Sequence, residues 1–428
     1  VLPHEPEGGV SADSLADMLH AFGLTVTAGP SRSLLVVRLP QDVEAASQPA
    51  VERDVAIPEI IVTSSLHRLD YSPPLTHTYL DRELATRIPT TAEEAVRLTN
   101  RLPGTANGGV SSRNHIRGGE VNETLFLLDG LRLYEPYHLK DFQAIATIVN
   151  SNAIGGMDFY TGAYPAHHGD RMSGVLSIEL REPVKPLETE LALSFFNASI
   201  VSLGTFGREQ QGDWLLSARR GNLDLIVDVV DPEFGSPDYR DFLGHVGWEF
   251  GPKARFSANL ILSDDEIRLF DAERGEQAQA AYTNRVGWLK WDADWTNRLR
   301  SQTLFAVSGI EDTRSGSVNL PGIVTGQLDD LLDVNVYEFR QDWTWVPRDR
   351  VMWSFGANLK HLDAHYLHQS ERTIDPVFQR ISGEPGQRTL DTDLTVDGAQ
   401  YAAYAELRWR FLDRFVVDAG LRWDQQTY

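Results

Sequence analysis

The stretches IRGGEVNETLFLLDGLRLYEP (residues 116–136) and GGMDFYTGAYPAHHGDRMSGVLSIELREP (residues 155–183) decide the fold of this chain. Each consists of short apolar segments separated by glycine-containing bends, a pattern typical of short strands. Asp129-Gly130 lies between the apolar segments Leu125–Leu128 and Leu131–Leu133. An Asp-Gly pair in this setting is a strong signal for a two-residue hairpin. The sequence therefore predicts a compact sheet of short strands.

Neighbouring segments complete this predicted unit. Asn152–Tyr160 and Ser173–Leu180 have the composition of its closing strands. Thr91–Asn100 is predicted to form a short helix, because a threonine can cap its start and acidic residues fall in its first turn. Ala144–Ile148 is apolar and is also predicted to be helical.

Beyond Pro183 the apolar and polar residues alternate with the period of two that β-strands require. In Leu289–Trp295 one face holds leucine, alanine and two tryptophans, whereas the other face holds a lysine and two aspartates. The same pattern recurs in three later segments, Tyr337–Trp345, Ala403–Phe411 and Phe415–Trp423. Aromatic residues on one face and charged residues on the other are typical of strands with lipid on one side and water on the other.

Short and long links alternate between these strands. The short links are Gly251–Ala254, Thr296–Leu299, Val346–Arg350 and Leu412–Arg414. The long links, which we expect to be loops, are Asp264–Ala281, Glu311–Leu332 and Asp363–Gly398. Such alternation fits a membrane barrel with short periplasmic turns and long extracellular loops.

The ordered series of bends, hairpin and closing GVLSI strand, followed by barrel-type strands, resembles the plug domain and barrel of TonB-dependent outer-membrane receptors. The resemblance implies a mostly β chain, with an N-terminal α+β plug domain and part of a transmembrane antiparallel β-barrel. The implied domains are a partial N-terminal domain (1–39), a linker with a TonB box (40–65), the plug (66–182) and the N-terminal half of the barrel (183–428). We expect eleven barrel strands by Tyr428, about half of the number found in this family.

The first unit, residues 10–39, is predicted to contain a helix followed by the strands Leu24–Thr27 and Ser33–Leu39. Ser11 can cap the helix and Gly23 can end it. The unit resembles the second half of the short N-terminal domain of secretins and signal-transducing TonB-dependent receptors, whose first half would lie upstream of Val1. A generic fragment with the same elements is the alternative.

A polar linker leads into EIIVTSS, a segment rich in β-branched residues. The resemblance implies that this segment is the TonB box, which pairs edge to edge with a strand of a TonB-type periplasmic energy-transducing protein. An ordinary first strand of the next domain is the alternative. The residues of the box are Glu59, Ile60, Ile61, Val62, Thr63, Ser64 and Ser65.

The resemblance also implies a latch between plug and barrel wall. In this family the arginine of the IRGG motif, here Arg117, tends to join charged contacts with the wall. Breaking a buried ion pair costs about 3–5 kcal/mol, a scale suited to a latch that force releases. Four further charged residues are predicted to join this network, Glu120, Glu123, Asp129 and Arg171. An exposed arginine beside two glycines is the alternative.

Two polar segments of the plug, Asn107–His115 and Arg132–Asp141, are candidate apices for ligand contact. They offer hydrogen-bond donors and aromatic faces that suit a polar ligand. Turns are rich in such residues in any case. The candidate ligand-binding residues are Arg113, Asn114, His115, Tyr134, Tyr137 and His138.

The predicted outer loops are acidic. Asp264–Ala281 holds six acidic residues and two arginines, and Asp363–Gly398 holds seven and three. Such loops repel bare anions and tolerate cations, neutral oligosaccharides or peptides. Solubility, and divalent bridging to anionic lipopolysaccharide, explain the acidity equally well.

The composition excludes several classes of protein. The net charge of −22 argues against nucleic acid as a partner. The absence of cysteine excludes disulfides and thiolate metal sites within this chain. No apolar run of about 18 residues predicts a transmembrane helix. The ten tryptophans, thirteen tyrosines and eighteen phenylalanines suit the aromatic girdles of a membrane barrel.

A catalytic or metal site is not expected. Adjacent histidines on a strand or turn point in opposite directions, so His167 and His168 would chelate poorly. Asp170 and Ser173 lie near them in sequence, but a catalytic triad is a spatial arrangement that sequence proximity does not imply. The resemblance implies a structural bend at this place, and no cofactor.

Three functions remain open from the sequence. The first is TonB-dependent active import of a scarce solute of the siderophore, cobalamin, oligosaccharide or peptide class across the outer membrane of a Gram-negative bacterium. The second is ligand sensing, reported through the N-terminal domain to an inner-membrane anti-sigma regulator. The third is a passive porin or surface-binding barrel, which requires neither plug nor TonB box. Outer-membrane lipid and lipopolysaccharide would surround the barrel in each case.

Overall fold

The structure is a computed structural model that describes residues 24–28, 34–38, 76–88, 90, 93–109, 111–141, 144–223, 236–271, 275–383, 385–412 and 415–428. The chain divides into two compact units, residues 1–63 and 64–428. In the first unit β1 (Leu24–Ala28) and β2 (Leu34–Arg38) pair as an antiparallel hairpin, which confirms the two predicted strands. The predicted helix before them and the predicted TonB box Glu59–Ser65 lie outside the described residues.

The N-terminal part of the second unit, here called the plug (residues 76–182), contains a sheet with the strand order β3-β8-β9-β6-β7. Its strands are β3 (His77–Asp81), β6 (Thr124–Leu128), β7 (Leu131–Arg132), β8 (Ile154–Tyr160) and β9 (Gly174–Leu180). β6 and β7 pair around Asp129-Gly130, whose φ angles are +45° and +86°. Positive φ at both central residues is the requirement of the predicted hairpin turn, so this prediction is confirmed. β4 (Thr105–Ala106) and β5 (His115–Ile116) form a second, two-stranded sheet.

The helical elements of the plug are short. They are α2 (Arg82–Arg87) and the 3₁₀ turns η3 (Ala95–Arg101), η4 (Val121–Glu123) and η5 (Ser151–Ala153). The helix predicted at Thr91–Asn100 is a 3₁₀ helix that starts later, after Glu94. The Glu94 side chain forms no capping hydrogen bond with this helix. The helix predicted at Ala144–Ile148 is wrong: this segment is irregular, because the main chain and hydroxyl of Thr147 bind the Glu94 carboxylate.

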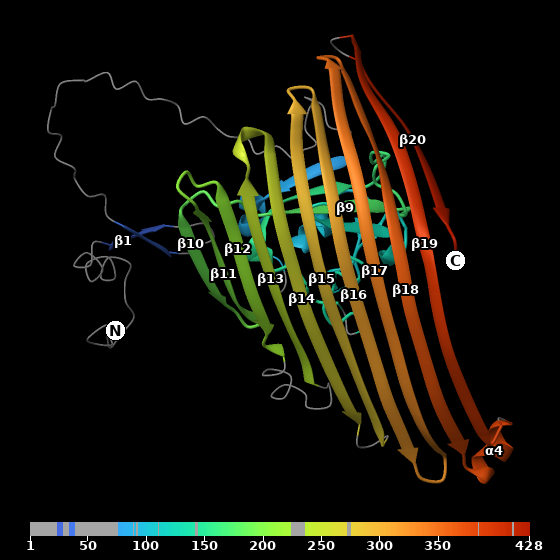
Figure 1. Ribbon diagram of the computed structural model, residues 1–428. Helices are drawn as coiled ribbons and strands as arrows, with labels where there is room; N and C mark the ends of the chain where they lie inside the picture. Colours follow the sequence, from blue (N-terminus) through green and yellow to red (C-terminus); the bar gives the residue numbers. More distant parts are fainter. Residues whose placement is uncertain are drawn as a thin grey trace, which may run out of the picture. The chain divides into compact units, whose positions relative to one another are not determined.

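The remainder of the second unit, here called the wall, is an antiparallel sheet of eleven strands in the described part of the chain, each paired with the next in sequence (Figure 1). This confirms the predicted strand number and the mostly β fold. The strands are β10 (Leu187–Leu193), β11 (Asn197–Phe206), β12 (Gly212–Gly221), β13 (Ser236–Glu249), β14 (Ala254–Asp271), β15 (Glu276–Thr296), β16 (Leu299–Leu320), β17 (Val324–Arg348), β18 (Val351–Ile374), β19 (Gln387–Leu412) and β20 (Phe415–Gln426).

The links at the two ends of the wall differ from the prediction in one respect. Three of the predicted short links, those at 251–254, 296–299 and 346–350, are tight turns, one of them the 3₁₀ turn η7 (Gly251–Lys253), and the fourth lies partly outside the described residues. The predicted long loops are instead mostly strand, since β14 and β15 together cover all but four residues of 264–281. β18 and β19 likewise extend to a short helix, α4 (Pro376–Ser382), between them. Polar residues continue the period-two pattern there, and pairing between neighbouring strands satisfies their backbone groups.

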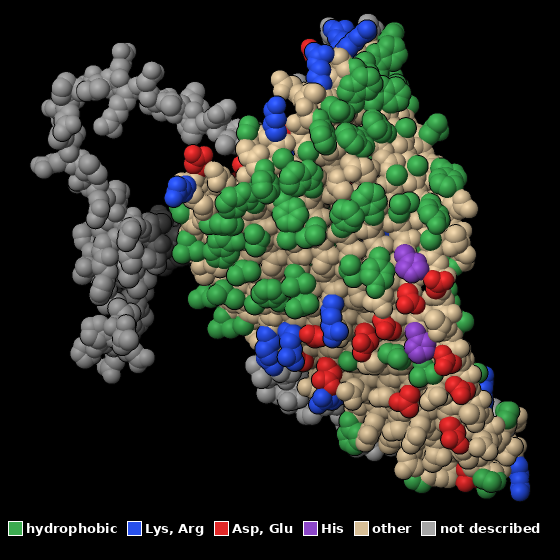
Figure 2. Space-filling view, in the orientation of Figure 1, with side chains coloured by type: hydrophobic (Ala, Val, Ile, Leu, Met, Phe, Trp, Pro, Cys, Tyr) green, Lys and Arg blue, Asp and Glu red, His purple; other side chains and the backbone are tan. Residues whose placement is uncertain are grey.

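The outer face of the wall carries the predicted aromatic and aliphatic side chains. Figure 2 shows them as a broad hydrophobic band, with charged side chains gathered beyond it along the longer strands. The side chains of Trp295 and Phe305 are 60% and 54% exposed. With up to 26 residues, the strands are longer than the about 9–11 that a bilayer requires, so they extend beyond the band. Among the described residues no helix is long and apolar enough to cross a membrane.

Candidate functional site

The plug and one part of the wall share a single apolar core. The core joins plug residues such as Phe126, Ile148 and Met157 to inward-facing side chains of β11–β16. The wall residues in it are Val201, Leu203, Leu215, Leu243, Ile261, Val286, Trp288, Leu304 and Ala306. A second cluster packs Leu139 and Ala146 of the plug against Tyr239 and Ile267 of the wall. Apolar burial therefore holds the plug against β11–β16.

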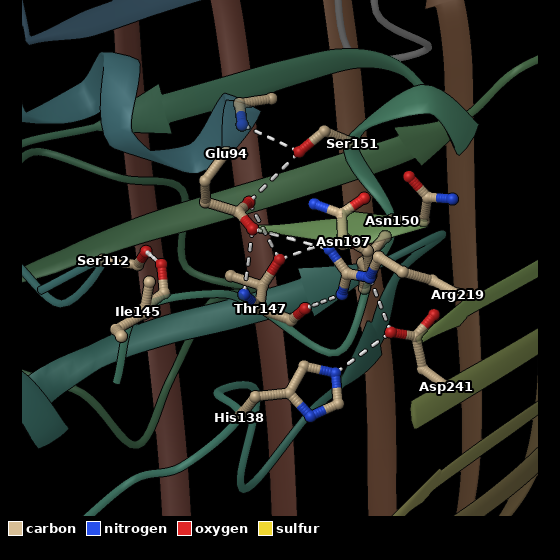
Figure 3. A network of polar contacts seen from close by, with 12 residues as sticks. Glu94, Ser112, His138, Ile145, Thr147, Asn150, Ser151, Asn197, Arg219 and Asp241 are labelled. Atoms are coloured by element: carbon tan, nitrogen blue, oxygen red, sulfur yellow. Dashed lines mark hydrogen bonds and ion pairs between the residues drawn. The ribbon is translucent and has the colours of Figure 1, made fainter. Parts of the chain in front are cut away.

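A chain of buried charged groups crosses the same interface (Figure 3). The Glu94 carboxylate of the plug accepts hydrogen bonds from the main chain and the hydroxyl of Thr147, both at 3.0 Å. Arg219 on β12 lies 3.9 Å from Glu94 and donates to Asp241 on β13 at 2.7 Å. It also donates to the carbonyl of Thr147. Every side chain in this chain of contacts is buried.

His138 of the plug extends the chain to β14. Its two ring nitrogens lie 3.0 Å from Asp241 and 2.5 Å from Asp265, and its residue exposure is 0%. Burial alone would lower the pKa of His138, but the carboxylates of Asp265 and Asp241 outweigh it and raise the pKa to about 9. His138 is therefore a cation at neutral pH, held between two anions of the wall.

At Glu94, by contrast with His138, the effect of burial on the pKa outweighs the effect of the charged and hydrogen-bonding partners. Burial raises the pKa of Glu94, whereas the charge of Arg219 and the donors of Thr147 lower it. A buried carboxylate is tolerated only when such partners compensate for its lost hydration. Glu94 and Arg219 therefore depend on each other across the plug–wall boundary.

Three more polar contacts strengthen this side. Lys140 forms an ion pair with Asp312 on β16. Asp141 accepts a hydrogen bond of 2.6 Å from the hydroxyl of Tyr282 on β15. Asn150 donates to Ser217 on β12 at 3.0 Å, and both residues are buried.

The plug faces β15–β20 differently, across a cavity of about 230 Å³. The plug side of this cavity is formed by the face of β6, β7 and β9 and by residues 167–170. Charged residues of both signs line it, namely Asp129, Arg132, Asp170, Glu179, Lys290, Arg300, Glu338, Arg340, Asp342, Lys360 and Arg422. Burial, followed by the charges of Asp158 and Asp129, raises the pKa of Glu179 to about 7. This side of the interface therefore carries charged groups of both signs beside the apolar Leu125 and Leu127.

Several direct contacts between described residues cross the cavity. Arg340 on β17 donates to the main-chain carbonyl of Gly130 at 2.8 Å. Arg422 on β20 donates to the main-chain carbonyls of Ala166 and His167 at 3.4 and 3.1 Å. His167 also lies 3.7 Å from Glu406 on β19. Most of the acceptors are neutral main-chain groups, unlike the buried carboxylates on the opposite side.

The predicted latch residues lie within the plug. Arg117 is exposed, with a φ of +50°, and approaches Thr161 at 3.4 Å. Glu120 and Glu123 form the capping box of η4. The Asp129 carboxylate accepts from the main chain of Leu180, and Arg171 contacts Asp170. Among the described residues, none of the five predicted latch residues forms a hydrogen bond or ion pair with the wall, so the structure places the charged plug–wall contacts elsewhere.

The six ligand-binding candidates are not brought together. Arg113 lies over the ring of Tyr137 at 5.5 Å, and Tyr134 lies under Arg132 at 4.3 Å. Asn114 is buried and donates to Thr99, whereas His115 contacts the carbonyl of Gly119. His138 belongs to the buried chain described above.

The sequence gives little sign of the buried chain. His138 stands in a segment that resembles an exposed apex, and Glu94 resembles a first-turn acid of a helix. The available signal is weak, because Arg219 in β12 and Asp241 in β13 share their inward faces with other polar residues such as Asp213 and His245. No spacing rule connects them, since Glu94 and Arg219 are far apart in the chain.

Among the described residues no group of histidine, aspartate and glutamate side chains is arranged to hold a metal ion. His167 and His168 stack on each other, with ring centroids 3.9 Å apart. His168 also faces Tyr160 at 5.9 Å.

Solved structures share this arrangement of plug and wall. The ferric enterobactin receptor of Pseudomonas aeruginosa matches 82% of this chain with a TM-score of 0.57 and 14% identity. The outer membrane transporter YddB of Escherichia coli matches 82% with a TM-score of 0.57 and 11% identity. The chain has the fold of TonB-dependent outer-membrane receptors. No family model and no curated protein matches its sequence.

A third match extends further along the chain. The ferripyoverdine receptor of the outer membrane of Pseudomonas aeruginosa covers 97% of this chain, with a TM-score of 0.58 and 11% identity. The chain spans 57% of the length of the first two structures and 59% of the third. Identities this low establish the receptor fold and leave ligand and partner open.

Proposed function

We propose that this chain belongs to an active importer of the Gram-negative outer membrane, with residues 66–182 as its plug and residues 183–428 as part of its barrel. The observation that carries the proposal is the buried chain Glu94–Arg219–Asp241–His138, which fixes a stopper to the inner face of a lipid-facing wall. Separating one buried ion pair costs about 3–5 kcal/mol. A passive pore has no use for such a stopper, whereas an energised importer needs one.

The proposed energy source is a TonB-type periplasmic protein that binds Glu59–Ser65. Strand addition requires an extended, β-branched segment on a tether, and this segment has that composition. A pull on it is transmitted to β3, the first described strand of the plug. No bound nucleotide or other cofactor is needed, because the proton gradient of the inner membrane supplies the energy.

The proposed cargo is a scarce polar solute, and ferric chelates are the first class to test. Two of the similar structures are named as receptors for ferric enterobactin and ferripyoverdine, which supports starting there. Of the ligand-binding candidates, Arg113, His115, Tyr134 and Tyr137 are partly exposed. We propose these four as the plug residues that contact solute. Cobalamin, oligosaccharides and peptides form the second panel.

The test is uptake by cells that express the whole gene, with and without residues 59–65. A matched control deletes Val43–Pro49, which shortens the linker by the same length. We expect the first deletion to abolish uptake of one solute while its binding at the cell surface remains, and the control to import normally. Uptake that survives loss of residues 59–65 would contradict the proposal and favour a passive pore.

Sensing is a second candidate, and one observation favours it. The 97% coverage by the ferripyoverdine receptor exceeds what residues 64–428 can supply alone, so the similarity reaches the unit that contains β1 and β2. We propose that this unit reports ligand occupancy to an inner-membrane anti-sigma regulator. Deletion of residues 1–39 should leave uptake intact and abolish solute-induced transcription. Unchanged induction would contradict a sensing role.

A further inference from the structure

We infer that the imported solute passes between the β6–β7–β9 face of the plug and strands β17–β20, with the short-turn ends of β15 and β16, while the plug remains attached to β11–β14 and to the remaining parts of β15 and β16. This inference rests on the proposed import function and names the route within it. The two sides of the plug–wall interface differ in apolar packing, in the burial of their charges and in the free space between them.

The attached side offers no path. The plug and the inner face of β11–β16 form one continuous apolar core, which excludes water and polar solute. Opening this side would also separate buried Glu94 from Arg219, and buried His138 from Asp241 and Asp265. Both consequences oppose separation at this place.

The opposite side already contains the beginning of a path. Its cavity is bounded by the plug face of β6, β7 and β9, with Leu125, Asp129 and Glu179 in its lining. The wall lining runs from Lys360 and Asn358 to Thr344 and Ser354, which lie close to the short turn between β17 and β18. The cavity therefore follows the strands toward the end of the wall that carries the short turns.

The chemistry of this cavity suits a hydrated, polar solute of either charge sign. Arg132 pairs with Asp170, and Arg340 with Asp342, so much of the lining charge is balanced locally. Lys360, in the same lining, lies 5.7 Å from the ring of Tyr134. A lining with groups of both signs can contact either an anionic or a cationic group of a solute without a large field of one sign.

A small movement of the plug would widen the cavity. The contacts that would break include the hydrogen bonds of Arg340 to Gly130 and of Arg422 to residues 166–167, and the contact of His167 with Glu406. Each arginine can exchange its main-chain acceptor for water, because both side chains face the cavity. No apolar core needs to open.

The test uses two engineered disulfides, since the chain contains no cysteine. Asn150→Cys with Ser217→Cys replaces a hydrogen-bonded pair on the attached side. Ala166→Cys with Gly420→Cys bridges the plug to β20, where a Cβ on residue 420 would lie 2.7 Å from that of Ala166. Because Cβ atoms in disulfides lie about 3.8 Å apart, the second bridge requires a shift of about 1 Å.

Solute uptake that depends on residues 59–65 is measured before and after the engineered disulfides are reduced. Variants with only one of the two cysteines serve as controls. We expect the 150–217 bridge to leave at least half of the wild-type rate, and the 166–420 bridge to reduce it at least tenfold until a reductant restores it. Recovery on reduction shows that the variant is folded.

The reverse pattern, or a block by both bridges, would overturn the route and leave import standing, since the reduced proteins still transport. Full transport with both bridges closed would also overturn it. Absence of box-dependent uptake in the wild type would instead remove the import function on which the route depends.

Discussion

The two sides of the plug–wall interface are built from the same kinds of strand yet hold the plug in different ways. Against β11–β16 the plug shares an apolar core and a chain of buried charges. Against β17–β20 and the short-turn ends of β15 and β16 it contributes to a charged cavity, crossed by hydrogen bonds mostly to main-chain carbonyls. Inward-facing side chains thus pack into an apolar core on one side and border a charged cavity on the other. A plug that closes the barrel at rest but moves during import needs this asymmetry. Uniformly weak attachment would let solutes pass at rest, and uniformly strong attachment would prevent the plug from moving.

The largest expected effect comes from breaking the attached side at Arg219. Replacing Arg219 by alanine leaves Glu94 buried without its cation and leaves Asp241 with His138 as its remaining cationic partner. We expect attachment of the plug to weaken by about 3–5 kcal/mol. The measurement is the urea concentration at which a protease begins to cleave the plug of the purified protein.

The neighbouring residue supplies the control. Arg220 points to the outer face, where its side chain is about half exposed and lies 3.8 Å from Asp238. Arg220→Ala should change stability by less than about 0.5 kcal/mol. Equal effects at the two positions would remove the distinction between buried and exposed charge on β12.

The next largest effect is a dependence of the stability of plug attachment to β11–β16 on pH. The pKa of His138 is about 9 in the structure and 6.5 when the residue is free, so its charge stabilises attachment. This contribution is fully present below pH 6.5 and is lost as the pH rises through about 9. At roughly 1.4 kcal/mol per pKa unit it is worth about 3 kcal/mol.

The same urea and protease assay between pH 6 and pH 10 checks this expectation. His138→Gln should flatten the loss of stability above neutral pH. His361→Gln, at a half-exposed histidine on β18, should not. A pH profile that is identical in wild type and His138→Gln would show that His138 carries no charge in the attached plug.

A smaller effect is expected at the hairpin that borders the cavity. Gly130→Ala places a side chain at a φ of +86° and 3.2 Å from the Arg340 guanidinium. We expect a loss of about 1–2 kcal/mol. Gly108→Ala is the matched control, since a Cβ there meets nothing within 4 Å. The urea concentration at the unfolding midpoint should therefore be lower for Gly130→Ala than for Gly108→Ala. Equal midpoints would show that alanine at residue 130 does not strain the turn.

The smallest effect is expected across the cavity at Arg422. Its guanidinium binds two main-chain carbonyls and pairs with the half-exposed Asp424 on its own strand. Arg422→Ala should cost less than about 1 kcal/mol, because water can replace these contacts. A loss as large as that of Arg219→Ala would show that the two sides hold the plug equally.

Local patterns in the sequence predict much of this fold. Asp129-Gly130 is sufficient to place a hairpin, and the alternation in Leu289–Trp295 and in later segments is sufficient to predict strands of membrane type. The extension of β14 and β15 through residues 264–281 is missed, because acidic segments without apolar alternation resemble loops. The irregular course of Ala144–Ile148 is missed because Thr147 binds Glu94, a partner about fifty residues away.

The candidate site is less accessible to sequence reasoning than the fold. Arg117 and Asp129 belong to recognisable motifs, yet their contacts lie within the plug. The residues that join plug to wall, such as Glu94, Arg219 and His138, are distant in sequence and belong to no motif. Their pairing depends on the register of β12, β13 and β14, which follows from the whole sheet rather than from local pattern.

The most direct test of the asymmetry is cysteine labelling during energised uptake. Ser177→Cys places a thiol in the cavity and Ser217→Cys places one in the attached interface, and both positions are buried. A water-soluble maleimide is added to cells with the proton gradient and the transported solute present or absent. Our account predicts that labelling of residue 177 accelerates under energised uptake while residue 217 stays protected. Faster labelling at residue 217 with no change at residue 177 would contradict it.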